Sequence, residues 1–371
     1  MLTNLPVQFN KEIYLLRLTV TTECILDCRY CFVYKNNQTI TYPVAIKAIT
    51  LFLNSPGNQK LLMLYGGEPL LKFKLVKRII NFAQKRARSV KKSLSISLGT
   101  NGILLNQRQL SFFKKAKIGL AISLDGRKDY HDKNRVFGNQ KGSFDAVLNK
   151  LPLALKNIKQ EKLCALFGVL PALADKIYNN LLYLTDLGFS SINIEPICSR
   201  RFSWSIKQKE CFQKGMVKLR QYIYANIKRG NFIFLNTVNR ELKDKRISSR
   251  DKECPFFGSL EVHPDGTLAF SPFLINSKDK EKYIIGDIQE GLKNKYRFCK
   301  HDPGCAQCRQ CWRNYSSNEV QTEATKGVNF NKVLQIRDSC SVDLAREVLK
   351  KAKSDPIFKE YVQEAKKRIF E

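Results

Sequence analysis

The sequence predicts an α/β fold with a parallel sheet that either closes into a barrel or stays an open arc of one. Three observations support this. Six short apolar runs recur between residues 12 and 197, amphipathic segments with helical periodicity separate them, and glycine or polar residues end several runs. Strands that alternate with helices pair in parallel through right-handed crossovers. At 371 residues and 43% hydrophobic, the chain suffices for one large domain, or for a main domain plus a smaller one.

The expected elements follow in order along the chain. The predicted strands are 12–20, 61–65, 93–98, 118–124, 164–170 and 190–197. The predicted helices are 44–53, 75–87, 109–116, 144–155 and 177–187. A longer helix at 208–230 leads to a charged connector and a cysteine-rich region, and the tail 342–370 has the pattern of one or two amphipathic helices.

The charge and the cysteine content limit the function classes. Sixty-four Lys and Arg against 33 Asp and Glu give a net charge of +31. This charge favours an anionic partner such as nucleic acid, an acidic membrane surface or an acidic peptide, and lysine-rich solvated helices explain it equally well. There is neither an apolar run of about 18 residues nor an export signal. We therefore expect a cytoplasmic protein without a membrane span, whose twelve cysteines are reduced thiols for metal or catalysis.

Three of these cysteines, Cys24, Cys28 and Cys31, form a C-x3-C-x2-C pattern. The offsets also suit one buried face of a helix, because cysteine packs as a small hydrophobe. As ligands, three thiolates can hold three irons of a [4Fe-4S] cluster and leave the fourth iron open. A structural zinc ion needs a fourth ligand, which His131 could supply only from a distant loop.

Further polar and glycine-rich segments end the next three predicted strands. Gly66-Gly67-Glu68-Pro69 follows the second strand, Thr100-Asn101-Gly102 the third, and Ser123-Leu124-Asp125-Gly126 ends the fourth. The carboxyl ends of parallel strands meet at one edge of the sheet, where ligands bind. Four loops at one edge therefore indicate a ligand site, which a buried helix face does not explain.

These segments together resemble the radical S-adenosylmethionine (SAM) superfamily. The cysteine motif with its following aromatic residue, GGEP at 66–69, SLDG-x4-HDKNR at 123–135, KGSFDAV at 141–147 and YIIGDIQEG at 283–291 occur in order. The resemblance is narrower to the peptide-modifying members with a C-terminal SPASM or twitch extension, which modify ribosomally made peptides. It implies a partial (β/α)6 TIM-like barrel at 1–230, a cysteine-rich SPASM/twitch-like auxiliary-cluster domain at 231–341 and a helical tail at 342–371.

The resemblance also implies residue roles at the matching positions. Cys24, Cys28 and Cys31 are expected to bind a [4Fe-4S] cluster whose open iron is chelated by SAM. The expected SAM contacts are Gly66, Gly67 and Glu68 at the amino group, Ser123 at the ribose, Arg135 at the carboxylate and Tyr30 near the adenine. Taken alone, Arg135 also suits a surface ion pair and Ser123 a strand-end cap. No catalytic side chain beyond these is assigned.

A second group of cysteines lies near the C-terminus. Cys305, Cys308 and Cys311 form a C-x2-C-x2-C pattern, whose tight spacing favours a metal site of zinc or iron–sulfur type. The resemblance favours at least one auxiliary Fe–S cluster, of [4Fe-4S] type and completed by Cys340. Cys254 and Cys299 are alternative ligands or parts of a second, incomplete site. We expect Cys164, Cys198 and Cys211 to be core or incidental residues.

The resemblance implies a peptide maturase that installs a C–C or thioether cross-link. Epimerisation is one alternative and sulfatase maturation another. The latter is disfavoured because Pro272 stands where sulfatase-maturing relatives have an acidic base. Ser271, which replaces an expected cysteine, argues instead against two complete auxiliary clusters. Radical modification of RNA and a zinc-stabilised nucleic-acid-binding protein rank lower. The implied partners are a precursor peptide with an acidic leader and an electron donor such as flavodoxin or ferredoxin. No N-terminal winged-helix-like extension is expected, so the leader would bind either a surface of the core domains or a separate leader-binding protein. No membrane partner is expected.

Overall fold

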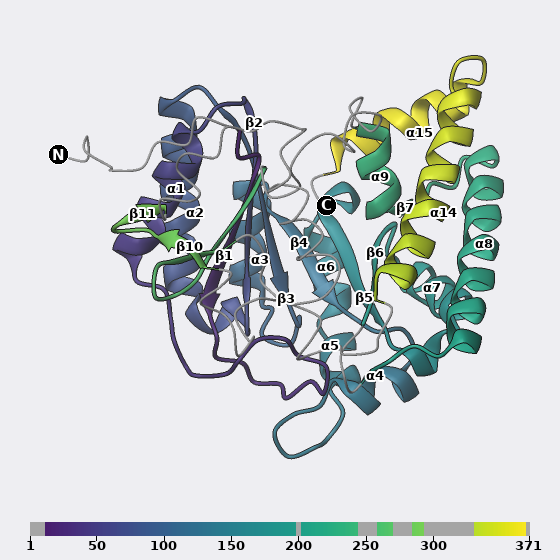
Figure 1. The fold of residues 1–371 in the computed structure, drawn as a ribbon, viewed down its shortest axis with the longest axis horizontal. Helices are drawn as coiled ribbons and strands as arrows, with labels where there is room; N and C mark the ends of the chain where they lie inside the picture. The colour runs from purple at the N-terminus through teal and green to yellow at the C-terminus, as the bar shows by residue number, and fades with distance from the viewer. Residues whose placement is uncertain (1–11, 198–201, 244–257, 270–283, 293–329, 369–371) are drawn as a thin grey trace, which may run out of the picture.

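A computed structural model of the chain describes residues 12–197, 202–243, 258–269, 284–292 and 330–368. Its strands form one eleven-stranded sheet in the order β11-β10-β9-β8-β1-β2-β3-β4-β5-β6-β7. The order is linear, so the sheet formed by the described strands is open and does not close into a full barrel (Figure 1). The α/β class with a parallel sheet is confirmed.

The six predicted strands are all present and all parallel. They are β1 (Leu15–Thr21), β2 (Gln59–Gly66), β3 (Ser93–Thr100), β4 (Gly119–Ser123), β5 (Leu163–Val169) and β6 (Ser191–Pro196). A two-residue strand that was not predicted, β7 (Phe234–Leu235), extends the sheet beyond β6 in the same direction.

The other edge of the sheet comes from far along the chain. β8 (Ser259–Val262) pairs in parallel with β1, and β9 (Thr267–Ala269), β10 (Ile284–Asp287) and β11 (Gly291–Leu292) continue from it in antiparallel order. These strands fall in the segment 231–341, for which a separate domain was expected. They continue the sheet of the first segment, and the division into three domains stays a prediction.

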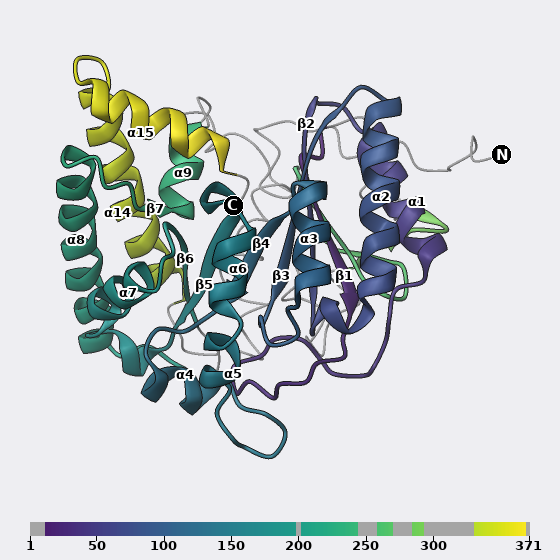
Figure 2. The same cartoon turned by 180° about the vertical axis from the view of Figure 1, so that it is seen from behind.

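Most of the predicted helices are confirmed. They are α1 (Tyr42–Asn54), α2 (Phe73–Ser89), α3 (Gln107–Ala116), α7 (Ile177–Asp186) and α8 (Ile206–Lys228). The side chains of Thr41, Asn106 and Ser205 cap the backbone N–H groups that begin α1, α3 and α8. The helices α1, α2 and α3 lie beside one another along the outside of the sheet (Figure 2).

The prediction of one helix over 144–155 is wrong. The segment forms two short helices, α5 (Phe144–Leu148) and α6 (Leu151–Asn157), with Pro152 in the first turn of the second. Proline has no N–H to donate and is tolerated at a helix start, so it favours a new helix over continuation. Two further helices, α4 (Lys128–Asn134) and α9 (Asn236–Lys243), were not predicted. The short 3-10 helices are Pro69–Lys72, Gln160–Lys162 and Pro171–Leu173.

The C-terminal tail forms two helices, α14 (Phe330–Lys351) and α15 (Pro356–Lys367). Helix α14 packs against α8 and α9 (Figure 1). The ring of Tyr361 in α15 stacks on Phe234 of β7, with 4.7 Å between the ring centroids. The expected boundary at 341/342 falls inside α14, which therefore carries Cys340. Across the described ranges, no helix is both long and apolar enough to cross a membrane.

The two faces of the sheet differ in chemistry. Residues such as Leu18, Leu64 and Leu98 are fully buried and belong to the main hydrophobic core, which also contains residues of α1, α2 and α3. Strand side chains alternate between faces, so Arg17 and Tyr65 lie on the opposite, inner face. Both are only partly buried. At Arg17 and Tyr65 the inner face is therefore polar and partly accessible, where a closed barrel has packed branched residues.

Candidate functional site

The three N-terminal cysteines lie in the loop that follows β1. Cys24 and Cys28 are partly buried, Cys31 is exposed, and none of them is in a helix. The helix-face explanation of their spacing is therefore wrong. The backbone N–H of Leu26 donates to Cys24 Sγ at 3.4 Å, and the Asn101 side-chain amide approaches the same sulfur at 3.9 Å. Hydrogen bonds of this kind stabilise the negative charge of a ligating thiolate.

The GGEP loop after β2 is joined to the cysteine loop by backbone hydrogen bonds. The N–H of Gly67 donates to Thr21 O, and the N–H of Glu68 donates to Glu23 O, both at 2.7 Å. Gly66 has a φ of +139°, and a Cβ atom on Gly67 would lie 2.1 Å from Glu23 O. Only glycine permits this conformation and this approach. The two glycines therefore hold the second loop against the first.

Glu68 connects the second and third loops. Its carboxylate is fully buried and accepts hydrogen bonds from Leu70 N at 3.0 Å, and from Thr100 Oγ1 and Asn101 N, both at 2.8 Å. Burial raises the pKa of Glu68 to about 7, although these three hydrogen bonds act in the opposite direction. The protein therefore already supplies donors to both carboxylate oxygens. A contact between Glu68 and the amino group of SAM stays a prediction.

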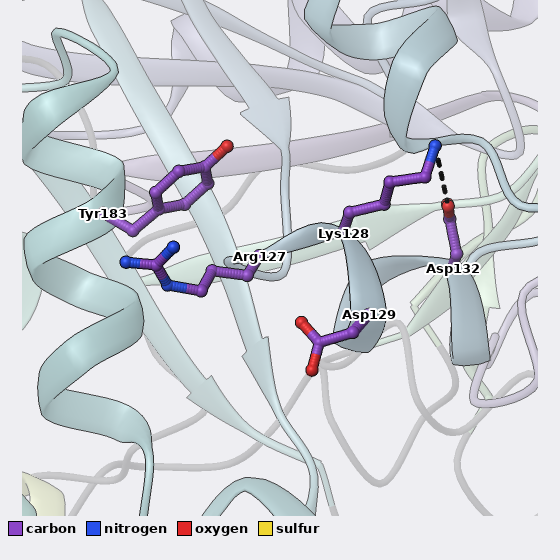
Figure 3. A pocket seen from close by; sticks show the side chains of 5 residues that line it. All are labelled: Arg127, Lys128, Asp129, Asp132 and Tyr183. Atoms are coloured by element: carbon purple, nitrogen blue, oxygen red, sulfur yellow. Dashed lines mark ion pairs between the residues drawn. The ribbon is translucent and has the colours of Figure 1, made fainter.

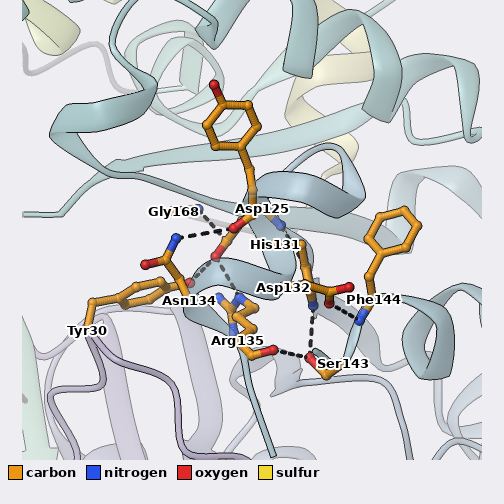
Figure 4. A network of polar contacts seen from close by, with 10 residues as sticks. Tyr30, Asp125, His131, Asp132, Asn134, Arg135, Ser143, Phe144 and Gly168 are labelled. Carbon is orange, nitrogen blue, oxygen red and sulfur yellow. Dashed lines mark hydrogen bonds and ion pairs between the residues drawn. The ribbon is translucent and has the colours of Figure 1, made fainter. Parts of the chain in front are cut away.

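Asp125 contacts two of the predicted SAM-binding residues, Arg135 and Tyr30 (Figure 4). Its Oδ2 pairs with Arg135 Nε at 2.9 Å and accepts a hydrogen bond from the Tyr30 phenol, while Oδ1 accepts from Gly168 N at 3.0 Å. The Arg135 guanidinium lies 5.3 Å from the centre of the Tyr30 ring. Burial acts to lower the pKa of Arg135, but the attraction of Asp125 outweighs it and raises that pKa. Asp125 thus ties the cysteine loop to the end of β4 and to Arg135.

His131 in α4 lies between Asp125 and Ser143 in this network (Figure 4). Its Nδ1 accepts a hydrogen bond from Asp125 N at 3.3 Å, so Nε2 carries the proton and donates to Ser143 Oγ at 3.0 Å. Ser143 in turn donates to Arg135 O at 2.8 Å. Burial lowers the pKa of His131 to about 4, and the ring is neutral at pH 7. A zinc ligand at His131 is not supported, because protein groups already engage both nitrogens.

Comparison with protein-family models identifies the domain that contains these loops. Residues 18–176 match the model of the Radical SAM superfamily. The chain contains a radical SAM domain. The cysteine motif, the GGEP loop, Ser123 and Arg135 all lie within the matched residues. The radical SAM domain and its relatives mark the chain as an enzyme.

Curated relatives and solved structures are similar to this chain in sequence or in fold. An uncharacterized protein of Methanocaldococcus jannaschii is 27% identical over 73% of this chain and 91% of its own. A cysteine-type anaerobic sulfatase-maturating enzyme of Clostridium novyi is 26% identical over 76% of this chain and 78% of its own. The structure of native anSMEcpe with bound AdoMet, which is SAM, superposes with a TM-score of 0.69 at 18% identity, over 92% of this chain and 100% of that one. Streptococcus suis SuiB bound to precursor peptide SuiA gives a TM-score of 0.52 at 14% identity, over 72% of this chain and 61% of that one.

The residues of the radical SAM domain fit an iron–sulfur cluster. Within the described ranges, no three His, Cys, Asp or Glu side chains are placed to share a single metal ion. A cluster has a different requirement, because each thiolate binds its own iron. Burial raises the pKa of the Cys28 thiol to about 11 and also raises that of Cys24. These thiols need a nearby positive charge to ionise, and iron supplies one. The three thiols and the two donors at Cys24 therefore suit such a cluster.

The remaining cysteines are described only in part. Cys340 lies on α14 and is partly buried. Cys254, Cys299, Cys305, Cys308 and Cys311, together with Cys198, Ser271 and Pro272, lie outside the described residues. The auxiliary site stays a prediction. Cys164 is fully buried in β5, as expected of a core residue, and Cys211 on α8 is partly buried.

A surface pocket of about 540 Å³ lies beside the start of α4 (Figure 3). It is lined by Arg127, Lys128, Asp129, Asp132 and Tyr183. The Arg127 guanidinium lies over the Tyr183 ring at 4.7 Å, and Lys128 pairs with Asp132 at 3.7 Å. None of the predicted site residues lines it. The pocket is therefore separate from the candidate site of the radical SAM domain.

Two residues near the site were missed by sequence reasoning. Asp125 lies inside the SLDG motif, yet no role was assigned to it. Glu261 in β8 is a carboxylate in an otherwise apolar strand, SLEV, and that strand was not predicted. The only sequence signal for a functional role was an acidic residue in a buried position, just after a strand for Asp125 and within a strand for Glu261.

Proposed function

We propose that the chain is a radical SAM peptide maturase that abstracts hydrogen from a ribosomally made precursor peptide and installs a C–C or thioether cross-link. The observation that carries the proposal is the joining of the cysteine loop to the GGEP loop at the carboxyl ends of β1 and β2, within the matched domain. The likeness to sulfatase-maturating enzymes and to SuiB, solved with a precursor peptide, supports a peptide substrate.

In this proposal the chain's own residues bind the cluster and orient SAM beside it. Cys24, Cys28 and Cys31 would hold the cluster, which when bound would supply the electron that splits SAM into methionine and a 5′-deoxyadenosyl radical. Gly66, Gly67 and Glu68 shape the SAM amino-group site, and Ser123 contacts the ribose. Arg135 contacts the SAM carboxylate and Tyr30 lies near the adenine. Asp125 is the positioning residue for both Arg135 and Tyr30.

Sulfatase maturation is the second candidate. The Clostridium novyi relative favours it, since it covers about as much of the chain as the uncharacterized one. Its reaction would convert a cysteine or serine of a sulfatase, rather than join two residues of a peptide. Pro272, in place of an acidic base, argues against this chemistry, and that residue lies outside the described ranges. Epimerisation is a third outcome that the same radical permits.

Helices α2 and α3 present a basic surface that an acidic leader could bind. From Pro69 to Leu124 the chain has thirteen Lys and Arg residues and no Asp or Glu. Gln84 of α2 donates to Ala116 O of α3 at 2.7 Å, so the two helices lie side by side. The exposed cations on this basic face are Lys74, Lys77, Arg78, Lys85, Arg88, Arg108, Lys114 and Lys115. We include this face in the proposal as the leader contact, with or without a separate leader-binding protein.

The remaining cofactor and partner roles complete the proposal. Cys305, Cys308, Cys311 and Cys340 would hold one auxiliary [4Fe-4S] cluster, with Cys254 and Cys299 as alternative ligands. The electron released when the substrate radical forms the cross-link would pass to this cluster, and the second hydrogen would leave as a proton. A flavodoxin or ferredoxin would deliver electrons to the cluster at Cys24, Cys28 and Cys31.

Mass spectrometry of the product tests the proposal. The enzyme is co-expressed with any small open reading frame found next to its gene, and the reconstituted enzyme is also given the Cp18Cys peptide seen with anSMEcpe. Loss of two hydrogens with a new inter-residue fragment link supports a cross-link. Exchange of a cysteine sulfur for oxygen, with loss of two hydrogens, would instead establish sulfatase-type maturation. No mass change with inverted stereochemistry would establish epimerisation.

A further inference from the structure

A buried carboxyl group lies on the inner face of the sheet, next to the GGEP loop. Glu261 of β8 is opposite Arg17 of β1, and Thr19 of β1 is opposite Tyr65 of β2. All four side chains therefore lie on one face of the sheet. Tyr65 directly precedes Gly66. This places Glu261 close to the predicted SAM contacts without being one of them.

The two oxygens of Glu261 have different surroundings. Oε1 accepts a hydrogen bond from Thr19 Oγ1 at 2.9 Å and another from the Tyr65 phenol. Oε2 is buried and has no hydrogen-bond partner among the described residues. A structural link between β8, β1 and β2 needs only Oε1. Leaving the second oxygen buried and unpaired costs stability, so its retention calls for another explanation.

A second unpaired polar atom lies in the same part of the sheet. Ser97 Oγ of β3 is buried and, within the described part of the chain, without a partner. The pairing register places Glu261, Arg17, Met63 and Ser97 in one row across β8, β1, β2 and β3. Arg17 and Met63 in this row are only partly buried. The row thus has an acceptor at one end, a hydroxyl at the other, and two partly exposed side chains between them.

The charges around Glu261 indicate what kind of group it would bind. Among the described residues, the ionisable groups that interact with it are Tyr65 and Arg17, and its neighbour on β9 is Ala269, which carries no charge. Burial raises the pKa of Glu261 to about 8, with the Tyr65 hydrogen bond and the Arg17 charge acting in the opposite direction. Arg17 would repel a cationic ligand, and the carboxylate would repel an anionic one. A neutral donor fits best.

We propose that Oε2 of Glu261 binds a neutral hydrogen-bond donor of the substrate, namely the thiol, hydroxyl or amide N–H of the peptide residue that is modified. Tyr65 and Thr19 are positioning residues, because they hold Oε1 and so aim Oε2. This inference rests on the proposed function in one respect, which is that the ligand is a peptide.

Infrared difference spectroscopy of the anaerobic holoenzyme with SAM tests the inference directly. The carboxylate band of Glu261 is identified above pH 8, where Oε2 is an acceptor, by its absence in Glu261→Gln. Glu241→Gln, which changes another buried carboxyl, is the matched control and keeps the band. The probes are the N-acetyl, N-methylamide derivatives of cysteine, serine and alanine. We expect at least one to shift the band. An equal shift with the alanine probe would identify the amide N–H as the donor, and no shift with any probe would overturn the inference.

Affinity for the Cp18Cys peptide is the second measurement. Glu261→Gln keeps an acceptor for Thr19 and Tyr65 but replaces Oε2 by an amide donor, so we expect its affinity to fall about tenfold. Glu241→Gln should bind as wild type does. Equal affinities of Glu261→Gln and wild type would overturn the inference. If wild-type enzyme modifies no peptide while a probe still shifts the Glu261 band, the proposed function fails and the donor site stands.

Discussion

Arg135 and Asp125 form a buried ion pair, with 2.9 Å between Nε and Oδ2, and the Tyr30 phenol donates to the same oxygen. Removing one partner of such a pair leaves the other charge uncompensated. We expect Asp125→Asn to lower the free energy of unfolding by about 3 kcal/mol and to reduce SAM cleavage strongly. Denaturant unfolding and 5′-deoxyadenosine assays measure both effects.

Asp145→Asn is the matched control for that substitution. Asp145 pairs with Lys128 on the surface, where its side chain is 67% exposed. Surface pairs contribute about 0–1 kcal/mol, and the control should lose neither stability nor activity. Wild-type stability and SAM cleavage in Asp125→Asn would show that Asp125 does not position Arg135.

The neutral state of His131 gives the stability a specific pH dependence. Burial lowers its pKa from 6.5 to about 4. Between these pH values His131 is therefore protonated in the unfolded chain and neutral in the folded chain. This contribution is complete above pH 6.5 and is lost as the pH falls toward 4, amounting to about 3 kcal/mol. Thermal unfolding between these pH values should show a shallower decline for His131→Gln. Parallel curves for the variant and wild type would contradict this role.

The contact between the GGEP loop and the cysteine loop depends on glycine. A methyl group at Gly67 would lie 2.1 Å from Glu23 O, which is backbone and cannot rotate away. We expect Gly67→Ala to lower the free energy of unfolding by about 2–3 kcal/mol and to reduce iron incorporation. Gly138→Ala is the control, because its added methyl group would meet nothing within 4 Å. Equal iron contents in the two variants would show that the loops can separate without loss of the site.

The basic face on α2 and α3 should bind acidic polypeptide. We expect the double variant Lys85→Glu, Arg88→Glu to weaken binding of a labelled glutamate-rich peptide at least tenfold at low salt, because interactions between exposed charges are screened only weakly there. Fluorescence anisotropy measures this. The control Lys207→Glu, Lys209→Glu makes the same charge change on α8 and should have little effect. Equal losses in both variants would mean that net charge, and not this face, attracts the peptide.

The sequence was sufficient to predict the helices and strands that have a local pattern of apolar residues. The six strands β1 to β6 were identified from apolar runs, and parallel pairing then placed four loops at one edge. The break before Pro152 was missed because the apolar periodicity continues across it. Strand β8 was missed because its four residues carry too little pattern, and its place beside β1 depends on contacts about 240 residues apart along the chain. The roles of Asp125 and Glu261 depend on burial and on partners from distant strands, which spacing does not report.

The central claim is that Cys24, Cys28 and Cys31 hold a cluster that cleaves SAM. The most direct measurement compares wild type, the triple variant Cys24→Ala, Cys28→Ala, Cys31→Ala and the control Cys211→Ala after anaerobic reconstitution and reduction. We expect the triple variant to lose about four irons per chain and all 5′-deoxyadenosine formation, while Cys211→Ala retains both. Zinc without iron or sulfide in the wild-type protein, or continued SAM cleavage by the triple variant, would contradict the claim.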